Sequence, residues 1–209
     1  MFEQLADLIF PAPCLACGKP PKPICSDCEP AFSLNQSDKD LFYAAELTAE
    51  MHQIITAVKD KGRTALIKPL AKGLAPVLAV AIETTKPTLL VCPPSSRKNF
   101  RKRGLNPALR IFKQANSSKV PITDRFLYLK QQPKEQRQLT ASERWENVRD
   151  IFGVRGKSER ILLVDDVRTT GSTLLGATTA IEAAGFEVVG SCVLAQRISF
   201  SQHSLEKKA

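Results

Sequence analysis

Two adjacent acids followed by a hydroxyl-rich turn are the residues of this sequence best suited by type and spacing to chemistry. The acids, Asp165 and Asp166, follow the apolar run 161–164, which has the length and β-branched content of a buried strand. Carboxylates at the C-terminal end of such a strand can accept hydrogen bonds from the vicinal hydroxyls of a sugar. Open α/β sheets bind their ligands at that edge. We therefore expect a sugar site here.

A helix is predicted to begin directly after the acids. From Gly171 the apolar spacing becomes helical, with Leu174, Thr178, Ile181 and Ala184 on one face. Backbone N–H groups at a helix start are unpaired and carry partial positive charge, so a turn that opens on glycine can hold a phosphate. The predicted phosphate-binding residues are Thr169, Thr170, Gly171, Ser172 and Thr173. The alternative, a capped helix beside surface acids, leaves two Asp without partners at the sheet, which is costly.

Four of the six cysteines form two Cys-x-x-Cys pairs near the start of the chain. Each pair can present two thiolates to one zinc ion, and a segment this short cannot bury enough apolar surface to fold without such a link. The predicted zinc ligands are Cys14, Cys17, Cys25 and Cys28. A labile site or disulfides are the alternatives, and a cytoplasmic chain disfavours disulfides. Cys92 and Cys192 lie in apolar runs, so we expect both in the core.

A second candidate site is the basic stretch 97–106, which follows a predicted strand at 88–92. It contains five basic residues and no acid. An Arg side chain offers a donor fork that matches phosphate oxygens, so this stretch suits either a pyrophosphate or a nucleic-acid backbone. A solvated charged loop is the plainer reading, but the position after a strand favours an anion site. The candidate residues are Arg97, Arg101, Lys102 and Arg103.

The remaining elements are predicted from apolar spacing. Helices are expected over 50–58 and 66–81, the second kinked or broken by Pro69 and Pro76, and a final strand over 187–194. Residues 29–48 show no strong periodicity and are interpreted as a connection. A capping box, Thr140-x-x-Glu143, predicts a short helix in the region between the two candidate sites.

Composition sets the scale of the molecule. A chain of 209 residues with 43% hydrophobic content has room for one α/β domain, predicted at 36–209, and a small cysteine-rich segment at 1–35. We expect no membrane span, because no apolar run reaches the required length, and a cytoplasmic location, because acids stand where a secretory signal carries Lys or Arg. The net charge of +9 suits polyanionic partners without separating nucleotides from nucleic acids.

The acids and the turn closely resemble the phosphoribosyl pyrophosphate (PRPP) loop of type I phosphoribosyltransferases. In that family the acids bind the ribose 2′- and 3′-hydroxyls and the turn binds the 5′-phosphate, which implies these roles for Asp165, Asp166 and residues 169–173. Four motifs stand in the order seen in the ComF family, to which the whole chain is similar. They are the cysteine pairs, Phe-Arg-Lys-Arg-Gly-Leu-Asn, Gln-x-x-Leu-x-x-x-Glu-Arg-x-x-Asn-Val and Asp-Asp-x-x-Thr-Thr-Gly-x-Thr.

The resemblance implies an α/β fold with a type I phosphoribosyltransferase-like central parallel sheet flanked by helices, and a small N-terminal four-cysteine zinc finger. It also implies PRPP bound with Mg²⁺, structural zinc, and a ComFC-like role in natural competence, with single-stranded DNA and DNA-uptake proteins as partners. The alternatives are a metabolic phosphoribosyltransferase with an unidentified acceptor, or a non-catalytic PRPP-sensing protein that binds DNA. Cys92 and Leu105 stand where the family often has Val and Phe.

Overall fold

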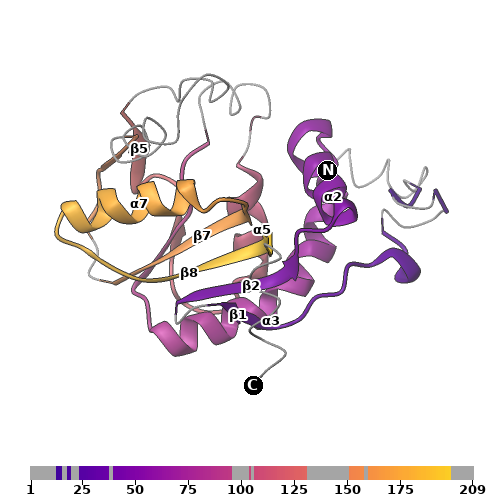
Figure 1. Cartoon of the computed structure of the whole chain (residues 1–209), viewed down its shortest axis with the longest axis horizontal. Helices are drawn as coiled ribbons and strands as arrows, with labels where there is room; N and C mark the ends of the chain where they lie inside the picture. The colour runs from indigo at the N-terminus through magenta and orange to yellow at the C-terminus, as the bar shows by residue number, and fades with distance from the viewer. Residues whose placement is uncertain are drawn as a thin grey trace.

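The fold is built on a six-stranded sheet in the order β1-β2-β8-β7-β3-β4, seen in a computed structural model (Figure 1). The structure describes residues 13–15, 18–19, 24–37, 40–95, 104, 106–130, 151–157 and 160–198. Edge strand β1 is antiparallel to β2, and the other five strands run parallel to one another. The strands are β1 Asn35–Ser37, β2 Leu41–Glu46, β3 Leu89–Val91, β4 Ile122–Thr123, β7 Arg160–Arg168 and β8 Glu187–Gln196. The predicted α/β class with a central, mostly parallel sheet is confirmed.

Helices cover both faces of this sheet. Helices α2 (Ala49–Lys61), α3 (Ile67–Thr85) and α5 (Pro107–Ala115) bury their apolar side chains in one core cluster. Helix α7 (Ser172–Ala183) covers the opposite face, together with a small antiparallel sheet of β5 (Leu127–Leu129) and β6 (Phe152–Val154). Short 3-10 helices, η1 Ser26–Cys28 and η2 Thr64–Leu66, complete the described elements. The sheet is therefore buried on both sides, as parallel sheets require.

The order of the strands reverses between β3 and β7. The chain leaves β3 through α5 to reach β4 on one side, and it leaves β7 through α7 to reach β8 on the other. Because α5 and α7 lie on opposite faces, their connections diverge beyond the carboxyl ends of β3 and β7, a region that we call the crevice. This is the position at which open α/β sheets bind ligands. Both candidate anion sites follow these two strands.

Helix α3 is the longest described helix, and its buried residues belong to the larger core cluster. Among the described residues, the stretch Thr64–Thr85 alone is long and apolar enough to cross a membrane, judged by length and composition. The expectation that no apolar run reaches the length of a membrane span therefore does not hold for this stretch. Leu70, Leu74 and Leu78 are completely buried against the rest of the protein, so this stretch has the packing of a core helix.

Three local predictions need correction. Residues 29–48 contain β1 and β2, and the run Leu41–Glu46 escaped notice because a strand buried on both faces shows no alternation. The buried face of α7 passes through Leu174, Ala177 and Ile181, whereas Ala184 lies beyond the helix and is exposed. Helix α3 continues through Pro76, so the predicted break is wrong, whereas the alternative of a kink at Pro69 or Pro76 remains a prediction.

The N-terminal segment is attached to the same core. Ile24 is buried in the larger cluster, and Leu15, Cys28 and Phe32 pack against it. The ring of Phe32 lies directly over Gly73 of α3, where any Cβ would overlap ring atoms. The predicted boundary at residue 35 remains a prediction, and the Thr140-x-x-Glu143 element lies outside the described residues.

Candidate functional site

Asp165 and Asp166 lie at the carboxyl end of β7, beside the crevice. Side chains alternate along the strand, with Leu163 in the α7-side cluster and Val164 in the cluster of α2, α3 and α5. Asp165 therefore continues the first face and Asp166 the second. Asp166 is buried, with 6% of its surface exposed, and Asp165 is half-buried. The two acids thus approach the crevice from opposite faces of one strand.

Lys59, in the last turn of α2, holds Asp166. Its ammonium donates a 2.7 Å hydrogen bond to Asp166 Oδ1, and 28% of the Lys59 side chain remains exposed. A cation near the C-terminus of a helix is also favoured by the helix dipole. Sequence analysis missed this residue, which stands in a charged stretch with Lys61 and Arg63. The apolar spacing of α2 placed Lys59 at the helix end, but no local signal linked it to a residue more than one hundred positions away.

Burial is the main cause of an altered pKa at Asp165. Withdrawal from water, followed by the negative charge of Asp166, raises the pKa of the Asp165 carboxyl to about 7, while Lys59 acts in the opposite direction. The backbone N–H of Asp166 donates to Asp165 Oδ1 at 2.8 Å, which also favours the charged form. Asp165 therefore changes charge near neutral pH.

The hydroxyl-rich turn links the acids to α7. Gly171 adopts φ 78°, the left-handed conformation that favours glycine, and it provides no side chain to accept hydrogen bonds from the first-turn N–H groups of α7. Thr169, Thr170 and Thr173 are exposed around this turn, and the Ser172 N–H donates to Thr170 Oγ1 at 3.4 Å. The turn thus presents hydroxyls and backbone donors to the solvent.

Arg168 adds positive charge to the same turn. A Cβ placed on Gly171 would lie only 2.9 Å from Arg168 Nε, so the guanidinium group packs over the turn. Its five donors suit phosphate oxygens. No role is predicted for Arg168 from sequence, because it occupies a variable position between the acids and the turn.

Asn106 joins the base of the basic stretch to the end of β3. Its Nδ2 lies 3.4 Å from the Pro93 carbonyl oxygen and 3.4 Å from Asp124 Oδ2, and its Oδ1 accepts from the Leu109 N–H to cap α5.

Burial, followed by the charges of Asp165, Asp166 and Asp124, raises the pKa of the Cys92 thiol well above its usual range. These acids therefore converge on one region at the carboxyl ends of the strands.

Cys92 and Cys192 are core residues, as expected. Both are completely buried in the larger cluster. Burial also raises the pKa of Cys192. Each thiol therefore stays neutral at physiological pH, which leaves neither suited to nucleophilic chemistry.

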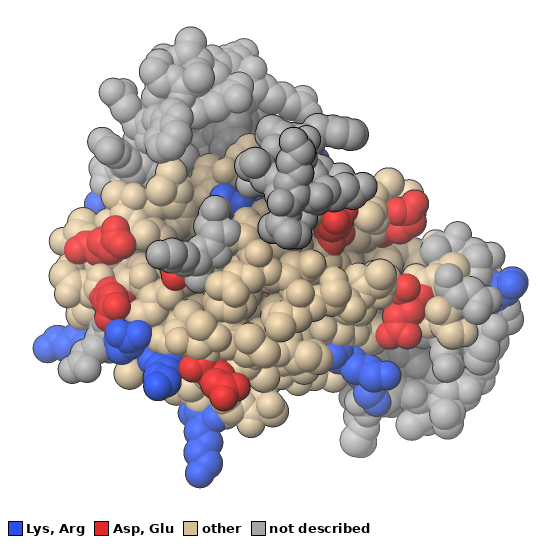
Figure 2. Space-filling view, turned by 60° about the horizontal axis from the view of Figure 1, so that its bottom comes forward, with Lys and Arg blue, Asp and Glu red and all other residues tan. Residues whose placement is uncertain are grey.

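The four basic candidates, Arg97, Arg101, Lys102 and Arg103, lie outside the described residues. The described part of the chain ends at Ser95, two residues beyond Pro93, and resumes at Gly104. On the face shown in Figure 2, the described Lys and Arg side chains alternate with Asp and Glu. That part of the surface therefore presents mixed charge instead of a continuous basic tract.

Three of the predicted zinc ligands come together near the N-terminus. The sulfur atoms of Cys14, Cys25 and Cys28 all lie within 4.8 Å of one another. Tetrahedral zinc with bonds of about 2.3 Å holds its sulfur ligands about 3.8 Å apart, so these thiols fit one ion after a small contraction. The Gly18 N–H donates to the Cys14 carbonyl oxygen at 2.8 Å, which closes the first turn. Cys17 lies outside the described residues.

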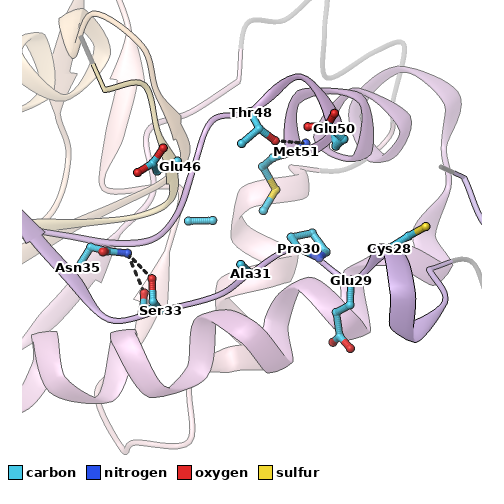
Figure 3. Close-up of a pocket in the computed structure, with 11 residues that line it drawn as sticks. Cys28, Glu29, Pro30, Ala31, Ser33, Asn35, Glu46, Thr48, Glu50 and Met51 are labelled. Atoms are coloured by element: carbon cyan, nitrogen blue, oxygen red, sulfur yellow. Dashed lines mark hydrogen bonds between the residues drawn. The ribbon is translucent and has the colours of Figure 1, made fainter. Parts of the chain in front are cut away.

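A separate cavity of about 530 Å³ lies between the cysteine segment and the start of α2 (Figure 3). Its lining includes the apolar residues Pro30 and Met51 and the acidic residues Glu29, Glu46 and Glu50. Thr48 accepts a 3.2 Å hydrogen bond from the Met51 N–H and so caps α2 here. The cavity adjoins the opposite end of α2 from Lys59, so it is distinct from the crevice.

Comparison with known proteins assigns the family. The sequence model of the phosphoribosyl transferase domain matches residues 64–207, which is more than half of the chain. The chain belongs to the phosphoribosyltransferase domain family. The matched region includes β3, α5, β7 and α7, and hence the crevice and both acids. The fold predicted for this family is the one observed.

Relatives of this phosphoribosyltransferase-family protein are distant. It is 37% identical over 60 residues to an orotate phosphoribosyltransferase from Pyrococcus furiosus, covering 29% of this chain and only 33% of that relative. The structural match to adenine phosphoribosyltransferase from Leishmania tarentolae covers 78% of this chain and 94% of that enzyme, with 14% identity and a TM-score of 0.43. The enzyme from Trypanosoma brucei, solved with AMP, pyrophosphate and ribose-5-phosphate, matches 84% and 99%, with 12% identity and a TM-score of 0.41.

Proposed function

We propose that this phosphoribosyltransferase-family protein binds PRPP with Mg²⁺ in the crevice beyond β3 and β7 and supports phosphoribosyl transfer. The observation that carries the proposal is the junction of β7 and α7. There, two acids at a strand end are followed by a glycine-opened, hydroxyl-lined turn at the start of a helix. This junction lies where the strand order reverses, and it offers acceptors for a sugar next to donors for a phosphate.

The binding roles follow from the chemistry of each part. In the proposal, Asp165 and Asp166 accept hydrogen bonds from the ribose hydroxyls. The turn donates to the 5′-phosphate through backbone N–H groups and the hydroxyls of Thr169, Thr170, Ser172 and Thr173. Arg168, which packs over Gly171, adds a charged donor. The basic loop after β3, with Arg97, Arg101, Lys102 and Arg103, neutralises the diphosphate.

The proposed reaction needs no protein nucleophile. The bond between ribose C1 and the diphosphate oxygen breaks, its electron pair leaves with the diphosphate, and a lone pair of the acceptor forms the new bond to C1. The acceptor proton passes to water. Mg²⁺, when bound to the diphosphate, neutralises charge on the leaving group. The protein residues orient the ribose and stabilise the same charge through fixed donors.

A ComFC-like role in natural competence is the finer part of the proposal. It places the protein in the cytoplasm, where it handles imported single-stranded DNA with uptake partners. The cluster of Cys14, Cys25 and Cys28 supports a structural zinc finger, with Cys17 as the fourth ligand. The net charge of +9 favours a polyanionic partner. A metabolic transferase or a PRPP sensor that binds DNA without turnover would share the same pocket.

Calorimetric titration of zinc-loaded protein with PRPP and Mg²⁺ tests the proposal, with pyrophosphate release measured in parallel. Wild-type protein should bind PRPP, and the double variant Asp165→Asn, Asp166→Asn should lose at least about tenfold in affinity because charged acceptors are removed. Adding single-stranded DNA tests the competence role through a change in PRPP affinity or release. Unchanged affinity in the double variant would contradict the ribose assignment.

A further inference from the structure

The Lys59–Asp166 pair places a cation at the edge of the acidic crevice. Among the described residues, Lys59 is the cation that forms an ion pair with the acids there, and its partner is the buried Asp166. The ion pair of Arg160 with Glu187 lies at the opposite, amino-terminal end of β7. Lys59 therefore brings positive charge to the carboxyl-terminal end of β7, where Asp166 lies.

Three acids lie near the carboxyl ends of β3 and β7, where Lys59 contacts Asp166. Asp165, Asp166 and Asp124 act together on the buried Cys92 thiol, so their fields overlap at the carboxyl ends of β3 and β7. A ligand with a diphosphate group would be repelled by these three acids. Lys59 contacts Asp166 at 2.7 Å and opposes this repulsion from the α2 side.

Lys59 also has the freedom to contact a ligand. With 28% of its side chain exposed, it is neither enclosed nor extended into solvent, and its ammonium has three donors. Asp166 Oδ1 occupies one of these donors. The remaining donors can serve a second acceptor without release of Asp166, and an ammonium on a flexible stem can turn toward it.

We infer that Lys59 contacts the diphosphate of PRPP while remaining bound to Asp166, so that one side chain joins the ribose site to the leaving group. The inference rests on the proposed function. A ribose hydroxyl bound to Asp166 lies about 2.8 Å from the carboxylate oxygen, and the diphosphate stands on the ribose carbon next to the 2′-hydroxyl. An ammonium bound to the same carboxylate therefore lies on the side of the ribose that carries the diphosphate.

This contact would contribute more to PRPP than to ligands without a diphosphate. Charge-assisted hydrogen bonds are stronger than neutral ones, and donors that face developing charge stabilise the transition state. Negative charge builds on the diphosphate as the C1–O bond breaks. Lys59 would therefore favour both binding and departure of the diphosphate, whereas a residue that only fixes Asp166 would affect every ribose phosphate equally.

The test compares PRPP with ribose 5-phosphate as ligands of the full-length protein, by calorimetry. Lys59→Gln removes the charge but keeps a donor for Asp166, and Lys59→Met removes both. We expect Lys59→Gln to weaken PRPP binding about tenfold or more and ribose 5-phosphate binding less than threefold. Lys59→Arg should bind PRPP within a few-fold of wild type, because it keeps the charge and the donors.

Lys61→Met is the matched control, since it removes a positive charge from the same helix at an exposed position. It should leave both affinities nearly unchanged, which would exclude a general effect of net charge. Equal losses for both ligands in Lys59→Gln, or no loss for either, would overturn the inference. If wild-type protein binds neither ligand, the proposed function itself fails, and this result is distinguishable because it precedes any comparison of variants.

Discussion

The backbone N–H of Asp166 donates a 2.8 Å hydrogen bond to the side chain of Asp165, at the end of a strand whose preceding side chains alternate between the two faces of the sheet. The adjacent acids are thus not equivalent. Asp166 has a lysine partner, whereas Asp165 is withdrawn from water and faces the charge of its neighbour. The strand therefore holds two unlike carboxylates next to each other and bears the cost of their repulsion.

The first prediction concerns pH. The pKa of Asp165 is raised from 3.8 to about 7 in the folded protein, so its contribution to stability is present below about pH 4 and is lost as the pH rises through 7. Asp165→Asn should therefore raise the free energy of unfolding at pH 8 by at least about 1 kcal/mol, with no gain at pH 4. Urea unfolding at both values measures this difference.

Glu83→Gln is the control for the pH experiment, because Glu83 is an exposed carboxylate on α3. It should change stability little at either pH. A gain for Asp165→Asn that is the same at pH 4 and pH 8 would show that the substitution acts through packing, and the assigned titration would be wrong.

The second prediction concerns Phe32 and Gly73. A Cβ at Gly73 would overlap the Phe32 ring, so Gly73→Ala must displace this ring from α3. Overpacking typically costs about 1–3 kcal/mol, against a gain of about 1 kcal/mol from the better helix propensity of Ala. We expect a net loss of stability in thermal unfolding, together with looser attachment of the N-terminal segment.

A double-mutant cycle separates these terms. In a Phe32→Ala background there is no ring to displace, so Gly73→Ala should stabilise the protein by up to about 1 kcal/mol. If Gly73→Ala has the same effect in both backgrounds, the position of the Phe32 ring does not depend on the absence of a side chain at residue 73.

Much of this structure follows from local sequence, and the exceptions have physical reasons. The run before Asp165 predicts β7, and Gly171 predicts the start of α7, because the burial of a strand and the start of a helix depend on residues that are close in sequence. Strand β2 was missed because burial on both faces removes the alternation that reveals a strand. Cys14, Cys25 and Cys28 were grouped correctly from spacing alone, since a short segment restricts where its thiols can lie.

Long-range partners were beyond such reasoning. Nothing near Lys59 specifies Asp166, and nothing near Asn106 specifies Asp124. These contacts depend on the order of strands in the sheet, which periodicity does not encode. The direction of Arg168 over Gly171 likewise depends on a side-chain conformation that the fold determines.

The third prediction concerns Asn106, which caps α5 and links it to the end of β3. Asn106→Ala should lower the free energy of unfolding by about 1–2 kcal/mol, because it removes the cap and leaves the Pro93 carbonyl and Asp124 without this donor. Asn106→Ser keeps a capping oxygen and loses the amide donors, so it should recover part of the loss. Equal stability of the Ala and Ser variants would show that the capping oxygen contributes nothing and that Asn106 acts through its amide donors.

The fourth prediction concerns the cysteine segment. Purified protein should contain one zinc ion per chain, because the thiols of Cys14, Cys25 and Cys28 already lie within 4.8 Å of one another. Cys28→Ser should lose the ion, and Cys17→Ser should do so if Cys17 is the fourth ligand. Elemental analysis after gel filtration measures the zinc content.

A chelator should also lower the melting temperature by several degrees, since Ile24 and Cys28 connect this segment to the main core. Wild-type zinc content in Cys28→Ser would contradict the site, and Gly18→Ala, which strains a left-handed turn without removing a ligand, should weaken zinc binding less than either cysteine substitution.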